Sequence, residues 1–238
     1  DKPVNLLAGE QHAPEYRAIN PRGEVPTLVH GTWTLTETSV INEYLAEAFP
    51  KPGFVPDDPQ ARAEMRYRVY RISDELHEAC GVLSYAVAVR PMQLLQPRDE
   101  VLATIEKMPD PVKRRRRRTI FEQGIESTEF VDGLRRHVDM LRALDDCLGH
   151  QPWLIGSEFT IADASLIPYI VRLEHLRMSA LLERAPNVAK WYEACSERPS
   201  FGSAIVDMMP APVLQATRKA GEAVWPQVAA IVSQWQAV

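Results

Sequence analysis

The sequence contains little cysteine and no long apolar run, and these two shortages narrow the class of protein. Its three cysteines, Cys80, Cys147 and Cys195, lie far apart and form no Cys-x-x-Cys pair. We therefore expect no disulfide framework and no metal site, and a reducing, cytoplasmic location suits the chain. No apolar run approaches the roughly 20 residues of a membrane span, and the first residues do not resemble a signal peptide. We expect a soluble protein without a membrane partner.

Positive charge is also in short supply, because 27 Lys and Arg oppose 32 Asp and Glu for a net charge of -5. This balance gives no general attraction to nucleic acid. The basic run at 113–118 invites such an interpretation. However, Glu122, Glu126 and Glu129 follow the run, and no aromatic residue interrupts it. We expect a solvated face or a cluster of salt bridges, which could also attract an anionic substrate, and no nucleic-acid partner.

The chain changes character near residue 50. Short β-like runs with turn residues come before that point, and helical periodicity dominates after it. The segment 49–59 joins the two parts and is rich in proline, with one glycine. Such residues continue neither a helix nor a strand ladder. We predict an α/β domain over residues 1–50, a linker over 51–59 and an all-helical domain over 60–238.

The predicted elements of the N-terminal part form a fragment of an α/β sandwich. A strand is expected over Pro3–Leu7 and a short helix or turn over Pro14–Ile19. Two further strands, over Pro26–Val29 and Thr32–Leu35, flank a two-residue connection, His30-Gly31. A helix follows, and its apolar face carries Val40, Ile41, Tyr44, Leu45 and Phe49.

The C-terminal part is predicted to be a series of helices. The first runs over Gln60–Val89 and ends at Arg90-Pro91. The polar stretch after it is expected to be an irregular insertion, with prolines at Pro97, Pro109 and Pro111. An apolar stripe marks a later helix, at Val131, Leu134, Val138, Leu141, Leu144 and Leu148. Further helices are expected over Thr160–Leu176, Val188–Glu197 and Val213–Trp235.

The segment Asn20–Leu28 contains the first pattern with chemical meaning. Pro26 enters a strand, removes one donor from the ladder and holds Val25 extended. With a cis Val25-Pro26 bond, the backbone N–H and C=O of Val25 face outward and could pair with an extended, peptide-like ligand. The alternative is an edge strand that begins with a trans proline.

The second pattern is a helix that starts at Thr38 or Ser39, directly after Glu37. Free N–H groups at a helix start attract a carboxylate, and Glu37 can accept a hydrogen bond from an ammonium group. An amino-acid head carries both charges, so Glu37 and Thr38 suit an α-amino acid. The alternative is an ordinary N-cap.

Taken together, the two patterns resemble the thioredoxin-like domain of the glutathione transferase superfamily. The match consists of Val25-Pro26 before a hairpin, followed by Glu37-Thr38-x-Val40-Ile41-x-x-Tyr44-Leu45. The resemblance implies that Val25, ahead of a cis Pro26, binds the cysteinyl backbone of glutathione. It also implies that Glu37 and Thr38 bind the γ-glutamyl head.

The loop before these patterns extends the resemblance. Gln11 and His12 stand where the superfamily reaches the glycyl carboxylate of glutathione, which is the expected cosubstrate. Glu24 departs from the superfamily's pattern, because glutamine or lysine is commoner at that position and suits an anion better.

The helical part supplies an independent match. In Gly156–Asp163, Thr160 is placed to cap a helix and Asp163 to reach back from N3 as a capping box. This motif resembles the structural core of the superfamily's helical domain, and Trp191-Tyr192, Arg198-Pro199 and Phe201 fit its late helix. The implied fold is that of a glutathione transferase. It joins an α/β thioredoxin-like N-terminal domain, which is incomplete because its first βα unit is lacking, to an all-α C-terminal domain.

The residue that activates the glutathione thiol is not assigned by this resemblance. In the superfamily it lies between the first strand and the first helix, and Asp1 stands where the second strand is expected. Free thiols ionise near pH 8.5, so an activating donor or dipole is needed at neutral pH. Either a preceding stretch is left out of this sequence or the natural chain is short. We favour the first, because a sheet without its inner strand exposes unpaired edges.

The electrophile is expected to bind against the first long helix. In the superfamily, one face of this helix borders the hydrophobic substrate site. Tyr70, His77, Cys80 and Ser84 lie there. Cys80 could be a nucleophile, but a small packed side chain is the simpler interpretation. The layout after Leu94 resembles bacterial members that cleave β-aryl ethers or remove halogen from aromatic substrates.

Two functions follow from the resemblance. In the first, the glutathione thiolate attacks a hydrophobic electrophile in a conjugation, β-aryl ether cleavage or dehalogenation, within a homodimer. In the second, the chain is a non-catalytic glutathione-transferase-like binding or scaffold protein.

Overall fold

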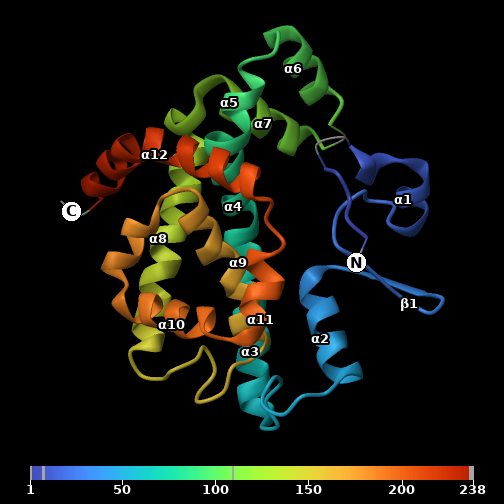
Figure 1. Ribbon diagram of the computed structural model, residues 1–238, viewed down its shortest axis with the longest axis vertical. Coiled ribbons are helices and arrows are strands. Elements are labelled where there is room, and N and C mark those ends of the chain that lie inside the picture. Colours follow the sequence, from blue (N-terminus) through green and yellow to red (C-terminus); the bar gives the residue numbers. More distant parts are fainter. Residues whose placement is uncertain (1, 7–8, 109, 236–238) are drawn as a thin grey trace.

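The computed structural model describes residues 2–6, 9–108 and 110–235. A small N-terminal part lies beside a larger helical body (Figure 1). The N-terminal part contains a 3₁₀ turn η1 (Glu10–His12), helix α1 (Pro14–Ile19), strands β1 (Thr27–His30) and β2 (Trp33–Thr36), and helix α2 (Thr38–Ala48). The helical body begins with α3 (Pro59–Arg71), the π-helical segment η2 (Ile72–Leu76), α4 (His77–Ser84), the π-helical segment η3 (Tyr85–Val89), α5 (Arg90–Gln93), α6 (Arg98–Glu106) and α7 (Pro111–Gln123). It continues with η4 (Gly124–Glu126), α8 (Thr128–Leu148), α9 (Ile161–His175), η5 (Ser179–Arg184), α10 (Pro186–Ser196), α11 (Pro199–Phe201), η6 (Gly202–Val206) and α12 (Ala211–Gln234).

The hairpin has the predicted strands but a different turn. Strands β1 and β2 are antiparallel, and His30 is paired with Trp33. The connection is therefore Gly31-Thr32, so the prediction of a His30-Gly31 turn was wrong by one residue. Gly31 has a φ of 62°, a conformation that glycine adopts without steric cost and that brings the two strands into register.

The strand predicted over Pro3–Leu7 is wrong for its described residues, 3–6, and Leu7 lies outside the described part. A strand needs a neighbour to pair with its backbone, and the chain here folds back onto η1 instead. The Asn5 amide donates to the Glu10 carboxylate at 2.7 Å, and the Glu10 amide donates to the Asn5 carbonyl at 3.2 Å.

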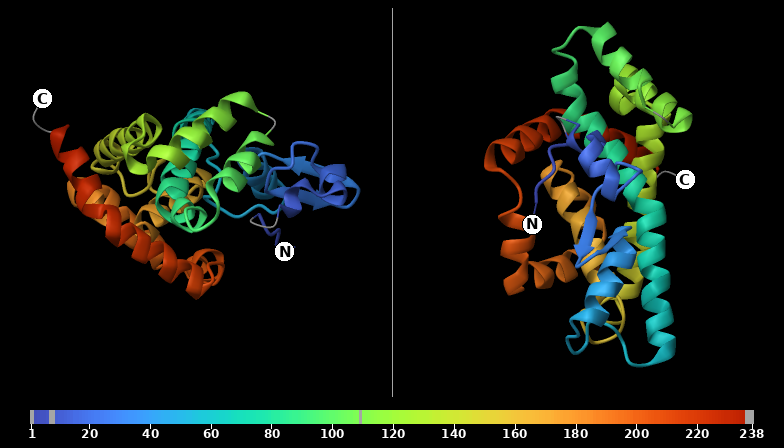
Figure 2. Two further views of the ribbon diagram at one scale, coloured as in Figure 1. Left: turned by 90° about the horizontal axis from the view of Figure 1, so that it is seen from above. Right: turned by 90° about the vertical axis from the view of Figure 1, so that its right-hand side faces the viewer.

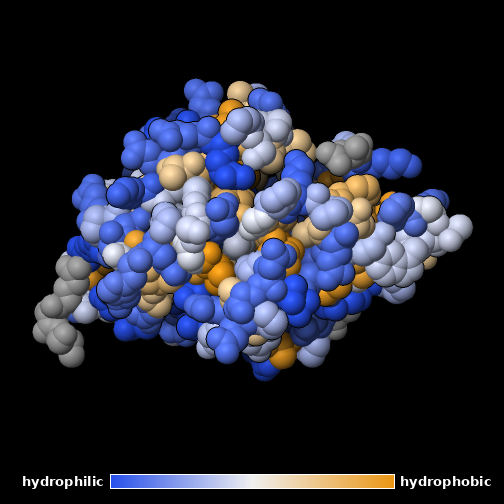
Figure 3. All heavy atoms as spheres, turned by 90° about the horizontal axis from the view of Figure 1, so that it is seen from below, coloured by the Kyte–Doolittle hydropathy of each residue, from blue (hydrophilic) through white to orange (hydrophobic). Residues whose placement is uncertain are grey.

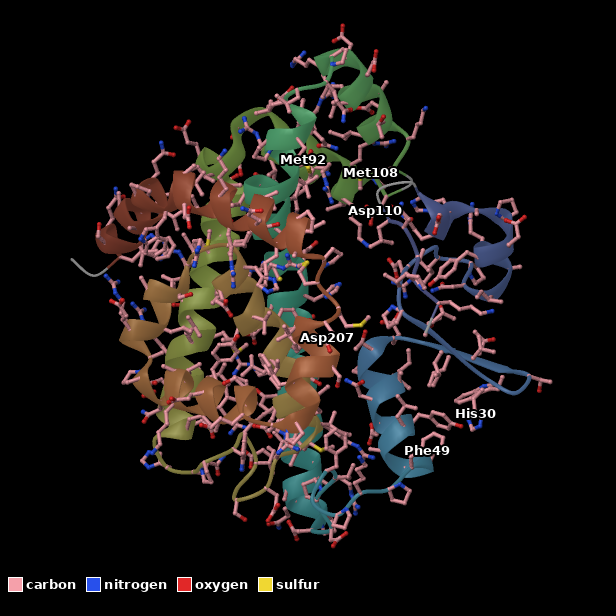
Figure 4. All side chains as sticks on the ribbon, in the orientation of Figure 1. His30, Phe49, Met92, Met108, Asp110 and Asp207 are labelled. Carbon is pink, nitrogen blue, oxygen red and sulfur yellow. The ribbon has the colours of Figure 1, made fainter. Side chains whose placement is uncertain are left out.

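Helix α2 forms as predicted, but its apolar face is only partly buried. Ile41 is buried, whereas Val40 and Phe49 remain 48% and 61% exposed. Phe49 is the residue after the helix, and its ring lies 6.1 Å from that of His30 on the hairpin, an arrangement that Figure 4 shows. The helix thus packs against the hairpin through rings at its C-terminal end.

The first long helix continues past its predicted end. The stretch from α3 to α5 runs from residue 59 to 93 as successive helical segments, so the prediction that Arg90-Pro91 ends it was wrong. The π-helical segment η3 comes directly before Arg90, and Pro91 is the second residue of α5. Pro91 has no backbone N–H to donate to the preceding turn, yet the helix continues to Gln93.

The stretch predicted to be an irregular insertion is two helices, α6 and α7. Pro97 precedes α6 and Pro111 is the first residue of α7, so these prolines mark helix starts; Pro109 lies outside the described residues. The Asp110 carboxylate caps α7 by accepting from the amides of Val112 and Lys113 at 2.8 and 3.1 Å. Figures 1 and 2 show the two helices as an arm that extends from the body toward α1.

The core of the helical body forms around α4, α8 and α9. The predicted stripe on α8 is buried from Leu134 to Leu148, and helices α9, α10 and α12 lie where the sequence predicts them. The predicted capping box is confirmed, because Asp163 accepts from the Thr160 amide at 2.8 Å. Asp163 also accepts from the Leu154 amide and from the indole of Trp191, both at 2.9 Å. Burial raises the pKa of this carboxyl, and the hydrogen bonds oppose that rise.

The surface seen from below is mostly hydrophilic, with apolar side chains exposed in separate groups (Figure 3). Within the described ranges, no helix combines the length and apolar character needed to cross a bilayer.

Candidate functional site

Hydrogen bonds from α1 and the residue after it fix the loop that carries Val25. The Val25-Pro26 bond is cis, which confirms the geometry predicted from the sequence, and Val25 is 41% exposed. The Tyr16 hydroxyl and the Asn20 amide nitrogen both donate to the Glu24 carbonyl at 2.7 Å. Because Asn20 is buried, these bonds fix the backbone just before Val25 and leave Val25 facing outward.

The η1 turn, with Gln11 and His12, lies against the same loop. A Cβ atom placed on Gly23 would come within 2.9 Å of both the Gln11 carbonyl oxygen and His12 Nδ1. This close approach and the φ of 63° at Gly23 explain why glycine stands there. His12 is exposed, and the buried Gln11 Oε1 has no hydrogen-bond partner among the described residues. The structure therefore brings both residues to the side of the Val25 loop.

Glu37 stands directly before α2, and Thr38 is the first residue of that helix. Glu37 has a φ of 72°, in the left-handed region that favours glycine, and such a residue costs about 1–3 kcal/mol of backbone strain. Strained residues of this kind concentrate at functional sites. Its carboxylate accepts from Arg22 Nη1 at 2.9 Å and is 56% exposed.

A chain of ion pairs connects Glu37 to the helical body. Arg22 also contacts Glu24, with its Nε 3.0 Å from Glu24 Oε2. The other carboxylate oxygen of Glu24 lies 3.4 Å from the Nζ of Lys113 on α7. The sequence predicted neither a role for Arg22 nor the contact between Lys113 and this loop. The only signal for them was Glu24 itself, an acidic residue in a position better suited to a neutral or basic one.

The residues predicted to bind the electrophile separate into two pairs. Tyr70 and His77 line a cleft of about 470 Å³ between α2 and the α3–α4 helix. Cys80 and Ser84 are not part of its wall. The remaining lining residues are Ser39, Val40, Glu43, Met65, Arg66, Val69, Ser73, Asp74, Glu78 and Ile161.

The cleft begins next to the start of α2, because two of its lining residues, Ser39 and Val40, directly follow Thr38. At its other side, His77 Nδ1 lies 3.4 Å from the Tyr169 hydroxyl. Burial raises the pKa of Tyr169 to about 12, so that hydroxyl keeps its proton at neutral pH. The cleft is therefore lined by apolar side chains, one imidazole and several charged side chains.

Cys80 behaves as a packed side chain. Burial raises the pKa of its thiol, while Arg172 and a hydrogen bond with Ser84 lower it by less. A raised pKa leaves little thiolate at neutral pH, and the thiolate is the nucleophilic form. This favours the packing interpretation of Cys80 over the nucleophile.

The basic run at 113–118 is a salt-bridge cluster, as predicted. Arg116 pairs with Glu78 on α4, and Arg118 pairs with Glu106 at 3.1 Å. The Arg117 guanidinium lies 3.8 Å from the centre of the Tyr85 ring. The contacts of Arg116 and Arg117 attach α7 to the first long helix, and the ion pair of Arg118 attaches it to α6. In the described part of the chain, no group of three or more His, Cys, Asp and Glu side chains is placed to hold a metal ion.

Comparison with known protein families gives two matches that together reach both parts of the chain. Residues 2–53 match the glutathione S-transferase N-terminal domain, and residues 126–194 match the glutathione S-transferase C-terminal domain.

Individual relatives are similar over most of the chain. The protein LigF of Sphingobium sp. is 29% identical over 204 residues, which cover 81% of this chain and 77% of LigF. A zeta-class glutathione S-transferase of Euphorbia esula is 30% identical over 211 residues, which cover 87% of this chain and 79% of that enzyme.

Solved structures share the fold. The crystal structure of the β-etherase LigF from Sphingobium aligns with a TM-score of 0.73 at 24% identity, over 86% of each chain. Glutathione transferase F7 from Populus trichocarpa aligns with a TM-score of 0.65 at 22% identity, over 91% of this chain and 85% of that one.

Proposed function

Because this chain belongs to the glutathione S-transferase family, we propose that it is an enzyme in which the thiolate of glutathione attacks a hydrophobic electrophile. Glutathione is the cosubstrate. The observation that carries the proposal is the position of Glu37. The backbone of Glu37 is strained, and its exposed carboxylate stands immediately before the free N–H groups of α2. Arg22 links this carboxylate to the loop that carries Val25.

Glutathione binding uses the two ends of this arrangement. The N–H groups at the start of α2, at Thr38, attract the carboxylate of the γ-glutamyl head, and Glu37 accepts from its ammonium group. The outward backbone of Val25, shaped by Pro26, pairs with the cysteinyl residue as a short added strand. Gln11 and His12, which lie against Gly23, face the glycyl end.

The electrophile occupies the cleft of about 470 Å³ that Tyr70 and His77 line. This volume is within the range of small-molecule sites. Cys80 and Ser84 lie outside its wall, and we propose no contact between them and the substrate. We assign no thiol-activating residue among the described ones.

The reaction we favour is cleavage of a β-aryl ether or loss of halide from an aromatic compound. In the ether reaction, the glutathione sulfur forms a bond to the ether carbon, the C–O bond breaks, and a phenolate leaves. The similarity to the β-etherase LigF supports this substrate class.

The test is glutathione-dependent turnover by the full-length protein, including any natural residues that precede Asp1. A β-aryl ether, a halo-aromatic compound and a general conjugation substrate are each incubated with and without glutathione, and the products are followed by mass spectrometry. Calorimetry measures glutathione binding in parallel. Binding without turnover of any of the three would instead favour the binding or scaffold function.

We further propose a domain division at 1–50, 51–59 and 60–238, a cytoplasmic location and a homodimer. Three free cysteines and the need for reduced glutathione suit a reducing compartment.

Large apolar side chains of the N-terminal part stay exposed, among them Val29, Trp33 and Phe49, and a two-fold dimer could cover them. Light scattering that gives a monomer at micromolar concentration would contradict the dimer.

A further inference from the structure

The charges of glutathione raise a question about this site. At neutral pH the tripeptide carries two carboxylates and one ammonium group. The γ-glutamyl head, with one of each, is accounted for by Glu37 and the start of α2. The second carboxylate lies at the other end of the peptide, and an extended chain of three residues spans roughly 10 Å.

The residue next to Val25 cannot hold that carboxylate. Glu24 is itself acidic, and like charges in close contact repel each other. Arg22 lies in the same loop, but it already contacts the carboxylates of Glu24 and Glu37 at 3.0 and 2.9 Å. Gln11 and His12 face the glycyl end, and a lysine or arginine from another part of the chain would add a full positive charge beside them.

The α6–α7 arm supplies one. The Lys113 side chain leaves the first turn of α7 and places its Nζ 3.4 Å from Glu24 Oε1. Asp110 caps that turn, and Arg114 donates to the carbonyls of Glu106 and Met108 at 3.0 and 3.3 Å. These bonds fix the backbone from which Lys113 projects. Figure 4 shows Met108 and Asp110 at the tip of the arm, facing the N-terminal part.

We propose that Lys113 is a glutathione-binding residue that pairs with the glycyl carboxylate. This rests on the proposed function, and it adds a cation from the helical part to a site otherwise built from residues 11–38. Lys113 is half-exposed, and its ammonium group has three donors, so it can contact Glu24 and a ligand carboxylate together. Three successive ion pairs, Lys113–Glu24, Glu24–Arg22 and Arg22–Glu37, connect the arm to Glu37 at the start of α2.

Two ligands and three variants test the proposal by calorimetry on the full chain. The ligands are glutathione and its glycyl ethyl ester, which lacks only the charge of the second carboxylate. Lys113→Met should weaken glutathione roughly fivefold, as loss of an exposed ion pair does, and should leave the ester unchanged. Glu24→Gln should strengthen glutathione binding, since it releases Lys113 from a competing carboxylate.

Arg115→Met is the matched control. It removes the same charge from the same run, but residues 113 and 115 lie on opposite sides of α7, about 200° apart. Arg115 is exposed, and no ion pair is found for it within the described residues. Its substitution should leave both affinities unchanged.

Each outcome is distinguishable. If Lys113 only attaches the arm to the loop, Lys113→Met and Glu24→Gln will change affinity in the same direction and will affect glutathione and the ester equally, which overturns the inference. Equal losses in Lys113→Met and Arg115→Met would also overturn it, because general electrostatics would then suffice. If the wild-type chain does not bind glutathione at all, the proposed function itself fails.

Discussion

Gly221 of α12 lies directly against the backbone of Leu176, at the end of α9. A Cβ atom at position 221 would come within 2.1 Å of the Leu176 carbonyl oxygen, a distance that no side-chain rotation can relieve. Helix α12 can approach the body this closely only because residue 221 has no side chain.

Gly221→Ala should therefore destabilise the protein by about 3 kcal/mol or more, as overpacking against rigid backbone does. The matched control is Gly81→Ala on α4, where an added Cβ meets no atom within 4 Å. That change should be stabilising by about 0.5–1 kcal/mol, because alanine favours helix over glycine. Urea unfolding followed by circular dichroism measures both. Equal free energies of unfolding for the two variants would show that α12 is not packed as described.

Cys80 should react slowly with iodoacetamide at pH 7, because burial raises the pKa of its thiol and leaves it protonated. The rate should rise as the pH is raised above 9, and mass spectrometry of the digested protein reports it residue by residue. Cys80→Ala should keep turnover within about threefold of wild type, since a packed side chain is only shortened. A variant that folds but loses turnover completely would restore Cys80 as a nucleophile.

The sequence predicted best where the chemistry is local. The cis Val25-Pro26 bond was implied by the resemblance of a short local motif, and the bonds of Asp163 to Thr160 follow from residues three apart. The α6–α7 arm was missed because Pro97 and Pro111 were interpreted as breakers, whereas prolines at the first turn are compatible with a helix.

Contacts between residues far apart in the chain could not be predicted in this way. Lys113 and Glu24 are 89 positions apart, and the unusual acidic residue at position 24 does not indicate which cation it contacts. The separation of Tyr70 and His77 from Cys80 and Ser84 had a similar cause. Residues Ser39, Val40 and Glu43 of α2 form the cleft with residues 65–78 of the first long helix, short of Cys80, and the local sequence of that helix does not indicate where α2 lies.

His137 should make the protein less stable in mild acid. Burial lowers the pKa of its imidazole below the usual 6.5, and the hydrogen bond between Nδ1 and the Gly133 carbonyl opposes this by less. Nε2 has no partner among the described residues. Below about pH 6.5 the unfolded chain binds a proton that the folded chain does not, so the free energy of unfolding falls as pH falls, by up to about 1.4 kcal/mol per pH unit. Above pH 6.5 this residue gives no pH dependence.

The measurement is urea unfolding between pH 7.5 and 5 for wild type and His137→Gln, whose amide can still donate to Gly133. The variant should show a shallower loss of stability. Some loss should remain, because burial also lowers the pKa of His175. Identical slopes for the two proteins would mean that His137 is protonated in the folded state.

Glu37→Gln should weaken glutathione binding far more than it weakens the fold. The carboxylate is more than half exposed and already pairs with Arg22, so solvent and that cation reduce what the ligand's ammonium group gains from it. We expect a loss of about tenfold, the lower end of the range for a charge-assisted hydrogen bond. The melting temperature should change little, because glutamine keeps the shape and can still accept from Arg22.

Glu47→Gln, on an exposed position near the other end of α2, removes the same charge and should leave affinity unchanged. Calorimetry with glutathione decides. Unchanged affinity in Glu37→Gln would make Glu37 a structural residue held by Arg22, and this conclusion would hold whichever electrophile the enzyme uses.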